Sequence, residues 1–144
     1  MTVAAILRHK GAEIAAVAPA TRIANVTATL TEWRIGAVLV LDAAGQLLGI
    51  VSERDIVRCV AREGAGCVEM TAAQLMTRVL YTVTPHTTVS QAMELMTTSR
   101  VRHLPVLDGD RLVGMISIGD VVKAQLDDQA LEVDSLRAYV AGSL

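Results

Sequence analysis

Hydrophobic residues follow one pattern along the chain, and the same pattern returns roughly 66 residues later. In each copy a short apolar run ends at a proline and is followed by apolar residues at helical spacing. Two further apolar runs joined by a polar turn then precede a second helical stretch. The apolar runs predicted as strands are residues 14–17, 37–41 and 47–51 in the first copy and 80–83, 104–107 and 112–116 in the second.

Equivalent positions fix the register of the two copies. Pro19 and Pro85 are 66 residues apart, whereas Gly49 and Gly114 are 65 apart. The one-residue difference falls in the turn between the last two strands, where a deletion costs little. The sequence therefore predicts a β-α-β-β-α unit that occurs twice.

Helix starts are indicated by threonines that are followed three residues later by glutamine. Thr71 with Gln74, and Thr88 with Gln91, match the capping box, in which each side chain bonds the backbone of the other residue. We expect a helix to begin at each of these threonines.

Segments outside the two copies complete the predicted architecture. Short helices over residues 3–7 and 71–76 are expected to lead into each first strand, and residues 63–70 to form a glycine-containing linker. A long amphipathic helix is predicted from 120 to about 142, with one interruption at Gln129. Its apolar stripe consists of Val122, Leu126, Val133, Leu136 and Val140.

The fold class follows from this order of elements. Neither copy alone can bury both helical faces against a three-stranded sheet, so we expect two copies packed together in an α/β fold of the α+β type. The predicted divisions are a first repeat with its lead-in helix over residues 1–68, a second over 69–125, and a C-terminal helical extension over 126–144.

Composition narrows the function classes. The 144 residues carry a formal net charge of −2, and only 2% of the side chains are aromatic. A nucleic-acid binder usually has a basic surface and rings on which bases stack, so we expect no nucleic-acid partner. No apolar run approaches the roughly 18 to 20 residues of a membrane-spanning helix, so we expect no membrane partner.

Compartment and metal content are indicated by the N-terminus and the cysteines. An apolar stretch followed by Arg8, His9 and Lys10 reverses the charge order of a secretory signal. Cys59 and Cys67 are too few and too isolated for a disulfide framework or a cysteine-rich zinc site. We therefore expect a cytoplasmic protein with free thiols and no bound metal.

Catalytic motifs do not stand out. A phosphate-binding Gly-x-x-x-x-Gly-Lys loop is absent, and the histidines His9, His86 and His103 are scattered. We therefore expect no catalytic residues, no enzymatic activity and no required cofactor.

The informative motif is Gly-x-x-Ser-x-x-Asp, which ends at Asp55 in the first copy and at Asp120 in the second. One interpretation is helix capping, with Ser at the N-cap and an acidic residue one turn in. The other is a ligand site, because free N–H groups at a helix start attract phosphate and an aspartate can accept bonds from ribose hydroxyls. The spacing alone leaves both open.

Three stretches carry a resemblance to a known family. They are Arg102 to Val106 (RHLPV), Gly49 to Asp55 (GIVSERD) and Gly114 to Asp120 (GMISIGD). With the repeated order of elements, they resemble a stand-alone tandem pair of cystathionine-β-synthase (CBS) domains, a Bateman module, over about residues 3–125. The resemblance implies two CBS repeats packed with pseudo-twofold symmetry, with an adenine nucleotide (AMP, ADP, ATP or NAD) bound between them.

The resemblance also implies two nucleotide sites, named here the Asp120 site and the Asp55 site after the aspartate of each motif. At the Asp120 site the serine and aspartate hold phosphate and ribose, a methionine lies beside the base, a basic pair lies near the phosphate, and the facing repeat adds two apolar residues. These are Ser117, Asp120, Met115, Arg102, His103, Ala15 and Ile35. The Asp55 site would use Ser52, Asp55, Ile50 and Arg54, with Tyr81 and Val101 from the second repeat.

The two implied sites differ in charge. Where the second copy has Arg102 and His103, the first has Gly36 and Ala37, so we expect the Asp120 site to bind a phosphorylated ligand more tightly. Arg34 and Arg100, which occupy equivalent positions, are further candidates for phosphate contact, although their alternative is a solvated surface charge.

The function that the resemblance implies is regulatory: the pair senses an adenine nucleotide and signals by a change of packing. The alternative is a ligand-free pair that serves structure or protein interaction. We expect a homodimer and an unidentified regulated protein as partners. The C-terminal stripe offers an additional seam for the dimer, unless it folds back on its own domain.

Overall fold

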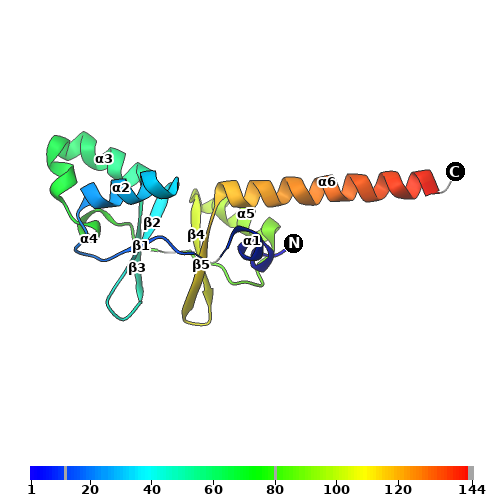
Figure 1. The fold of residues 1–144 in the computed structure, drawn as a ribbon, viewed down its shortest axis with the longest axis horizontal. Coiled ribbons are helices and arrows are strands. Elements are labelled where there is room, and N and C mark those ends of the chain that lie inside the picture. The colour runs from blue at the N-terminus through cyan, green and yellow to red at the C-terminus, as the bar shows by residue number, and fades with distance from the viewer. Residues whose placement is uncertain (12, 80, 143–144) are drawn as a thin grey trace. The chain divides into compact units, whose positions relative to one another are not determined.

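The computed structural model describes residues 1–142 except 12 and 80, and these residues form two packing units. Unit 2 contains Glu13–Leu80, and unit 1 contains Met1–Ala12 together with Tyr81–Leu144. Figure 1 shows the elements of both units in chain order by colour. Each unit is described by itself below.

Unit 2 contains the strands and helices of the first repeat. Its sheet has the order β1-β2-β3, with β1 parallel to β2 and β2 antiparallel to β3. The central strand β2 has four consecutive fully buried residues, 37–40, which explains its unbroken apolar run. The elements are β1 (Ala16–Val17), α2 (Ile23–Trp33), β2 (Ala37–Leu41), β3 (Leu47–Ser52), α3 (Glu53–Glu63), the 3₁₀ helix η1 (Gly64–Glu69) and α4 (Ala72–Leu75).

Unit 1 contains the second repeat and the N-terminal helix. Its sheet consists of two antiparallel strands, β4 and β5, and its core gathers apolar residues from every element of the unit. Of the strand expected over 80–83, residue 80 lies outside the described residues and Val83 forms a single parallel bridge. The elements are α1 (Val3–Lys10), α5 (Val89–Ser99), β4 (His103–Asp108), β5 (Arg111–Ser117) and α6 (Ile118–Gly142).

A proline explains why the first strand of the second repeat is reduced to a bridge. In unit 2 the backbone N–H of Leu39 donates to the carbonyl of Ala15, 3.0 Å away, and so extends the β1–β2 ladder. The equivalent of Leu39 is Pro105, which has no N–H to donate. Its carbonyl still accepts from the N–H of Val83 at 3.0 Å, and the ladder stops there.

The predicted capping boxes are confirmed. The Thr71 hydroxyl accepts from the N–H of Gln74, whose side chain accepts from the N–H of Thr71, and α4 begins here. The same reciprocal bonds join Thr88 and Gln91 at the start of α5. Such local bonds are fixed by spacing alone, which is why the sequence predicted them.

The expected linker over residues 63–70 is wrong, because this segment folds into η1 and packs. Cys67 is fully buried in the core of unit 2, and the Sγ of Cys59 lies 3.5 Å from the Sδ of Met70. Burial, together with the neighbouring Cys59, raises the pKa of the Cys67 thiol to about 11, so this thiol is protonated at neutral pH. The segment completes the core and does not act as a spacer.

The lead-in helices pack with the repeat that they do not precede. The N–H of Val3 in α1 donates to the carbonyl of Thr87, ahead of α5, at 2.8 Å. In the same way the N–H of Ala72 in α4 donates to the carbonyl of Thr21, ahead of α2, at 2.8 Å. The predicted divisions assign each lead-in helix to the repeat that follows it in sequence. In the packing units the assignment is exchanged, so that α1 belongs with the second repeat and α4 with the first.

The predicted C-terminal helix is present as α6, which is continuous over 25 residues. Only Val121 and Ala124 of this helix are buried, and the described remainder carries several exposed apolar side chains. Within the described part of the chain, none of the helices is both long enough and apolar enough to cross a membrane.

Candidate functional site

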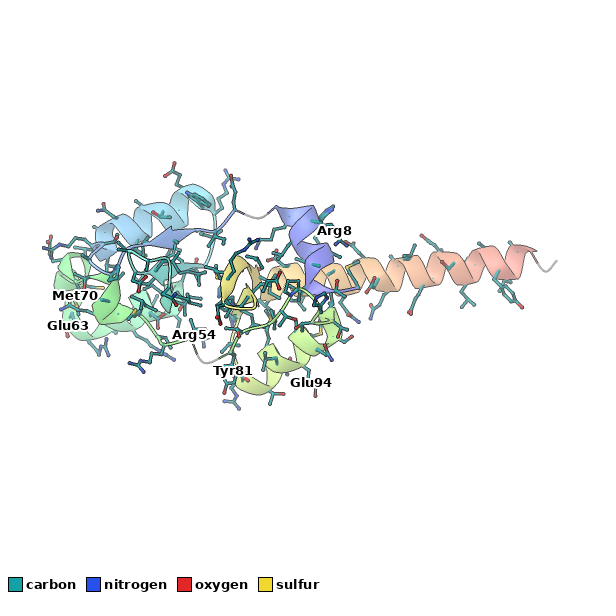
Figure 2. The ribbon with its side chains drawn as sticks, turned by 90° about the horizontal axis from the view of Figure 1, so that it is seen from below. Arg8, Arg54, Glu63, Met70, Tyr81 and Glu94 are labelled. Carbon is teal, nitrogen blue, oxygen red and sulfur yellow. The ribbon has the colours of Figure 1, made fainter. Side chains whose placement is uncertain are left out.

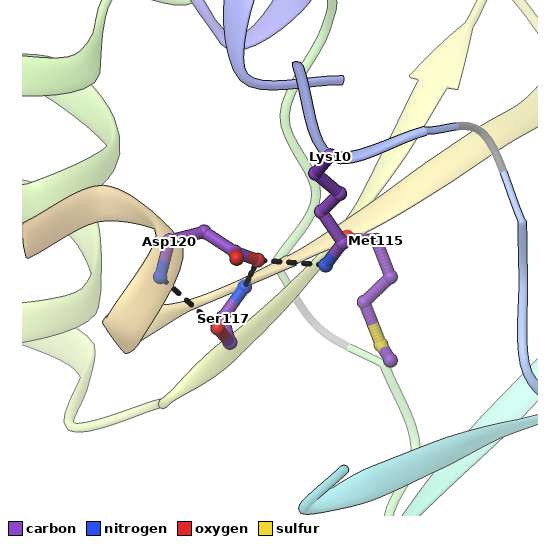
Figure 3. Close-up of polar contacts among 4 residues, drawn as sticks. All are labelled: Lys10, Met115, Ser117 and Asp120. Carbon is purple, nitrogen blue, oxygen red and sulfur yellow. Dashed lines mark hydrogen bonds and ion pairs between the residues drawn. The ribbon is translucent and has the colours of Figure 1, made fainter. Parts of the chain in front are cut away.

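The junction between β5 and α6 carries the second copy of the Gly-x-x-Ser-x-x-Asp motif. The backbone N–H of Ser117 donates to Oδ2 of Asp120 at 2.8 Å, and the N–H of Asp120 donates to the Ser117 hydroxyl at 3.2 Å. Figure 3 shows these reciprocal bonds at the start of the helix. The pair therefore caps α6.

The junction between β3 and α3 repeats this geometry in unit 2. The N–H of Ser52 donates to Oδ2 of Asp55 at 2.8 Å, and the N–H of Asp55 donates to the Ser52 hydroxyl at 3.3 Å. Here the Ser52 hydroxyl also donates to Oδ2 of Asp55 at 3.0 Å. Capping is thus a property of both motifs, as one interpretation of the sequence predicted.

Most donors at the two helix starts are already used inside the protein. The first N–H of α3, on Glu53, donates to the carbonyl of Gly36 at 2.9 Å, and the first N–H of α6, on Ile118, donates to the carbonyl of Arg102 at 2.8 Å. The third N–H of each helix is held by its capping serine. A phosphate at either junction would therefore depend more on side-chain charge than on backbone donors.

Lys10, at the end of α1, adds a cation to the Asp120 junction. Its Nζ lies 2.7 Å from Oδ2 of Asp120 and donates to the carbonyl of Met115 at 2.9 Å (Figure 3). The hydrogen bonds from Lys10 and from the Ser117 backbone both end on Oδ2, so within the described residues Oδ1 of Asp120 accepts none. Oδ1 of Asp120 is therefore available to a ligand, whereas the Ser117 side chain already interacts with the carboxylate.

Thr77 occupies the corresponding place beside Asp55. Its hydroxyl donates to Oδ1 of Asp55 at 3.0 Å, and its backbone exchanges two 2.9 Å hydrogen bonds with Ile50. Both oxygens of the Asp55 carboxylate are thus engaged, unlike those of Asp120. The two junctions therefore differ in free acceptors as well as in charge.

The environment of Asp120 favours its ionised form. Partial burial raises the pKa of this carboxyl, but the hydrogen bonds from Lys10 and from the Ser117 backbone act in the opposite direction and hold the pKa below its ordinary value of 3.8. At neutral pH the carboxylate is a charged acceptor, the form that binds hydroxyl groups most strongly.

Sequence reasoning missed Lys10 and Thr77. Lys10 is 110 residues from Asp120 in the chain, and Thr77 is 22 residues from Asp55. No local spacing links residues so far apart. The one usable signal was that both follow a predicted lead-in helix.

The motif glycines make room for the chain that precedes each repeat. A Cβ on Gly49 would lie 2.8 Å from the backbone oxygen of Thr77 and 2.8 Å from the Sδ of Met76. A Cβ on Gly114 would lie 2.7 Å from Cδ2 of Leu7. At both glycines the group that approaches closely is a lead-in segment, and a side chain at either position would collide with it.

The remaining residues predicted for the Asp120 site that belong to unit 1 lie next to the junction. His103, at the start of β4, pairs with Ser117 across the sheet, and Met115 pairs with Pro105. Arg102 is exposed immediately before β4. The structure therefore brings Arg102, His103, Met115 and Ser117 together with Asp120.

The residues predicted for the Asp55 site within unit 2 are also placed around their junction. Ile50 lies in β3 and is half-buried, and Arg54 is exposed on the first turn of α3 (Figure 2). Next to them, a shallow groove of about 470 Å³ is lined by Leu30, Thr31, Arg34, Ile35, Gly36 and Glu53.

Residues predicted to act from the facing repeat stay predictions. In unit 2, Ala15 is buried and Ile35 is half-buried beside the groove. In unit 1, Tyr81 is exposed and Val101 packs against the core. The further arginine candidates, Arg34 and Arg100, both end a helix with a left-handed backbone conformation.

Replacing Lys10 tests the ion pair. We expect Lys10→Met to lower the free energy of unfolding at pH 7 by about 0.5 to 1 kcal/mol, because both partners are partly exposed. The pKa of Asp120 is lower in the folded protein than in the unfolded chain. The stability contributed by the ion pair is therefore fully present above the unfolded-state pKa and is lost as the pH falls through the folded-state pKa.

Urea unfolding between pH 7 and pH 3 measures this difference. The difference in the free energy of unfolding between the variant and the unsubstituted protein should decrease toward the acid end. Lys123→Met is the matched control, because Lys123 is an exposed lysine of α6. A Lys10 effect that does not change with pH would contradict the assignment.

Comparison with known proteins gives consistent matches. A family model described as the CBS domain matches residues 3–62 and 72–127. The chain is 39% identical over 118 residues to the CBS domain-containing protein CBSX3, mitochondrial, of Arabidopsis thaliana, which is 79% of this chain and 57% of that protein. The chain thus spans little more than half the length of this relative.

Solved structures agree with the family match. The CBS-domain containing protein ATU1752 from Agrobacterium tumefaciens is 43% identical with a TM-score of 0.83, and the match covers 86% of this chain and 92% of that one. The CBS domain protein PAE2072 from Pyrobaculum aerophilum, solved in complex with AMP, is 25% identical with a TM-score of 0.74 and coverages of 83% and 89%.

Proposed function

Because the chain belongs to the CBS-domain family and carries two copies of the domain, we propose that it is a regulatory module that binds an adenine nucleotide. The expected ligands are AMP, ADP, ATP and NAD. The complex of PAE2072 with AMP supports this class of ligand. In this proposal the protein is a sensor and not an enzyme, so its ligand is bound and released without turnover.

The observation that carries the proposal is the open acceptor of the Asp120 carboxylate. Oδ1 of Asp120 is a charged acceptor that is not used within the described residues, and it lies beside the Ser117 hydroxyl. An aspartate placed in this way can accept from both hydroxyls of a ribose. Arg102, His103 and Lys10 supply positive charge for a phosphate.

The Asp120 site is the tighter of the two in this proposal. At the Asp55 site Thr77 already donates to Oδ1 of the aspartate, and Gly36 and Ala37 replace the basic pair. A ribose would have to displace the Thr77 hydroxyl there. Ala15 and Ile35 at the Asp120 site, and Tyr81 and Val101 at the Asp55 site, are proposed to contact the base.

The protein is further proposed to act as a homodimer that passes the signal to a regulated protein. Its proposed compartment is the cytoplasm, because both cysteines are buried free thiols, which suit a reducing environment.

Thermal unfolding with added nucleotide tests the proposed function. A ligand that binds only the folded state, present at about ten times its Kd, stabilises that state by roughly 1.4 kcal/mol. We therefore expect AMP, ADP, ATP or NAD to raise the Tm, and the supernatant of denatured protein to contain an adenylate mass. Guanosine monophosphate is the control. Absence of both signals would favour the ligand-free structural pair.

A further inference from the structure

Helix α6 continues well beyond the core of its own unit. Its last buried residue is Ala124, and the helix then runs to Gly142, roughly five turns. Figure 1 shows this part extending past α1, α5 and the strands of unit 1. Isolated helices of this length are marginal in water, so a partner surface would stabilise it. Its exposed apolar side chains are Leu126, Leu131, Val133, Leu136, Tyr139 and Val140.

A heptad pattern organises most of these side chains. With Leu126 at position a, Val133 and Val140 also fall at a, and Gln129 and Leu136 fall at d. In the same frame the buried residues Val121 and Ala124 fall at c and f, on the opposite side of the helix. The a positions therefore lie away from the buried side of α6, and the d residues Gln129 and Leu136 line an open groove with Met1 and Ser90 of unit 1. Leu126 is 59% exposed and Leu136 is 64% exposed.

Charges beside the seam identify its partner. Glu132 falls at g and Arg137 at e of the next heptad, five residues later. In a parallel two-stranded coiled coil, a residue at g faces the residue at e of the following heptad in the other helix. A second, parallel copy of this helix would therefore form two Glu132–Arg137 pairs, one on each side of the seam. An antiparallel copy would instead place like charges opposite each other.

We propose that residues 126–140 of α6 form a parallel two-stranded coiled coil with the same segment of a second copy of the chain. Glu132 of each copy then pairs with Arg137 of the other. Gln129 lies at a d position, where a polar side chain restricts register. The aspartates at 127, 128 and 134 fall at b and c, outside the seam. This inference stands independently of nucleotide binding.

Cysteine crosslinking tests the orientation. In a parallel coil Leu136→Cys places two thiols at facing d positions, so mild oxidation should give a disulfide-linked dimer on a non-reducing gel. Leu131→Cys is the matched control, because Leu131 is as exposed (66%) but falls at f, away from the seam. The native cysteines are buried. Absence of the dimer from Leu136→Cys, or equal yields from both variants, would overturn the proposal.

Charge reversal tests the pairing. Glu132→Lys and Arg137→Glu should each weaken dimerisation in sedimentation equilibrium by roughly five- to tenfold, because each creates two like-charge contacts. The double variant restores opposite charges and should regain most of the affinity. A double variant that is no better than the singles would refute the Glu132–Arg137 pairing.

A substitution within the seam tests whether the coiled coil is needed for dimerisation. Val133→Asp puts a charge at a central a position and should raise the dimer Kd at least tenfold. Because Val133 is exposed and lies beyond the core of unit 1, the Tm of the main transition and the nucleotide-induced Tm shift should remain. An unchanged dimer Kd would show that α6 is not the seam.

Discussion

An Asp120→Ala variant is expected to bind an adenine nucleotide ten- to a hundredfold more weakly than the unsubstituted protein. The substitution removes Oδ1, the charged acceptor proposed for the ribose, and a hydrogen bond to a charged group contributes roughly 1.5 to 3 kcal/mol. It also leaves Lys10 without its carboxylate partner. Isothermal titration calorimetry at neutral pH measures the change in the tighter binding phase.

Asp55→Ala is the matched control. Asp55 and Asp120 form the same capping box with a serine, so both variants lose a similar part of helix stability. Asp55→Ala should change the tighter phase little. If both variants lose only stability and keep their affinity, the motif serves capping alone. A tight phase that disappears with Asp55→Ala and survives Asp120→Ala would reverse the assignment of the two sites.

Gly49→Ala is expected to destabilise unit 2 by about 1 to 3 kcal/mol, the usual range for overpacking. The new methyl group would meet the backbone oxygen of Thr77 at 2.8 Å. That oxygen accepts from the N–H of Ile50, and the N–H of Thr77 donates to the carbonyl of Ile50, each at 2.9 Å. The backbone at Thr77 cannot move aside without losing both hydrogen bonds to Ile50 and the contact of Thr77 with Asp55.

Gly114→Ala provides the comparison at the equivalent position. There the methyl group meets only the flexible end of the Leu7 side chain, which can turn away. We expect a loss below about 1 kcal/mol, and urea unfolding of the two variants measures the difference. Equal losses at both glycines would mean that the backbone of Thr77 does not set the cost.

The order of elements and the helix caps at Thr71 and Thr88 could be predicted from the sequence. A capping box joins residues three apart, and a buried strand such as 37–41 shows as an unbroken apolar run, so short-range spacing reports both. The family resemblance, drawn from the motifs ending at Asp55 and Asp120, is confirmed by the match over residues 3–62 and 72–127.

Other features depend on residues that are distant in sequence. The apolar run over 80–83 resembles that of β1, yet among its described residues only Val83 pairs, because Pro105 on the neighbouring strand has no N–H to donate. The segment over 63–70 was predicted to be a linker because it contains glycines. In the structure, however, Cys67 of this segment is buried in the core. Neither outcome can be read from the segment itself.

By itself the sequence determined the duplication, the capped strand-to-helix junctions and the position of the aspartate in each. The tertiary structure alone decided how these two aspartates differ. Packing of α1 against β5 and α6 brings Lys10 to Oδ2 of Asp120 and leaves Oδ1 open, whereas the segment after α4 brings Thr77 to Oδ1 of Asp55. The physical reason is that hydrogen bonds and ion pairs depend on distance in space, and chain folding sets that distance for residues far apart in sequence.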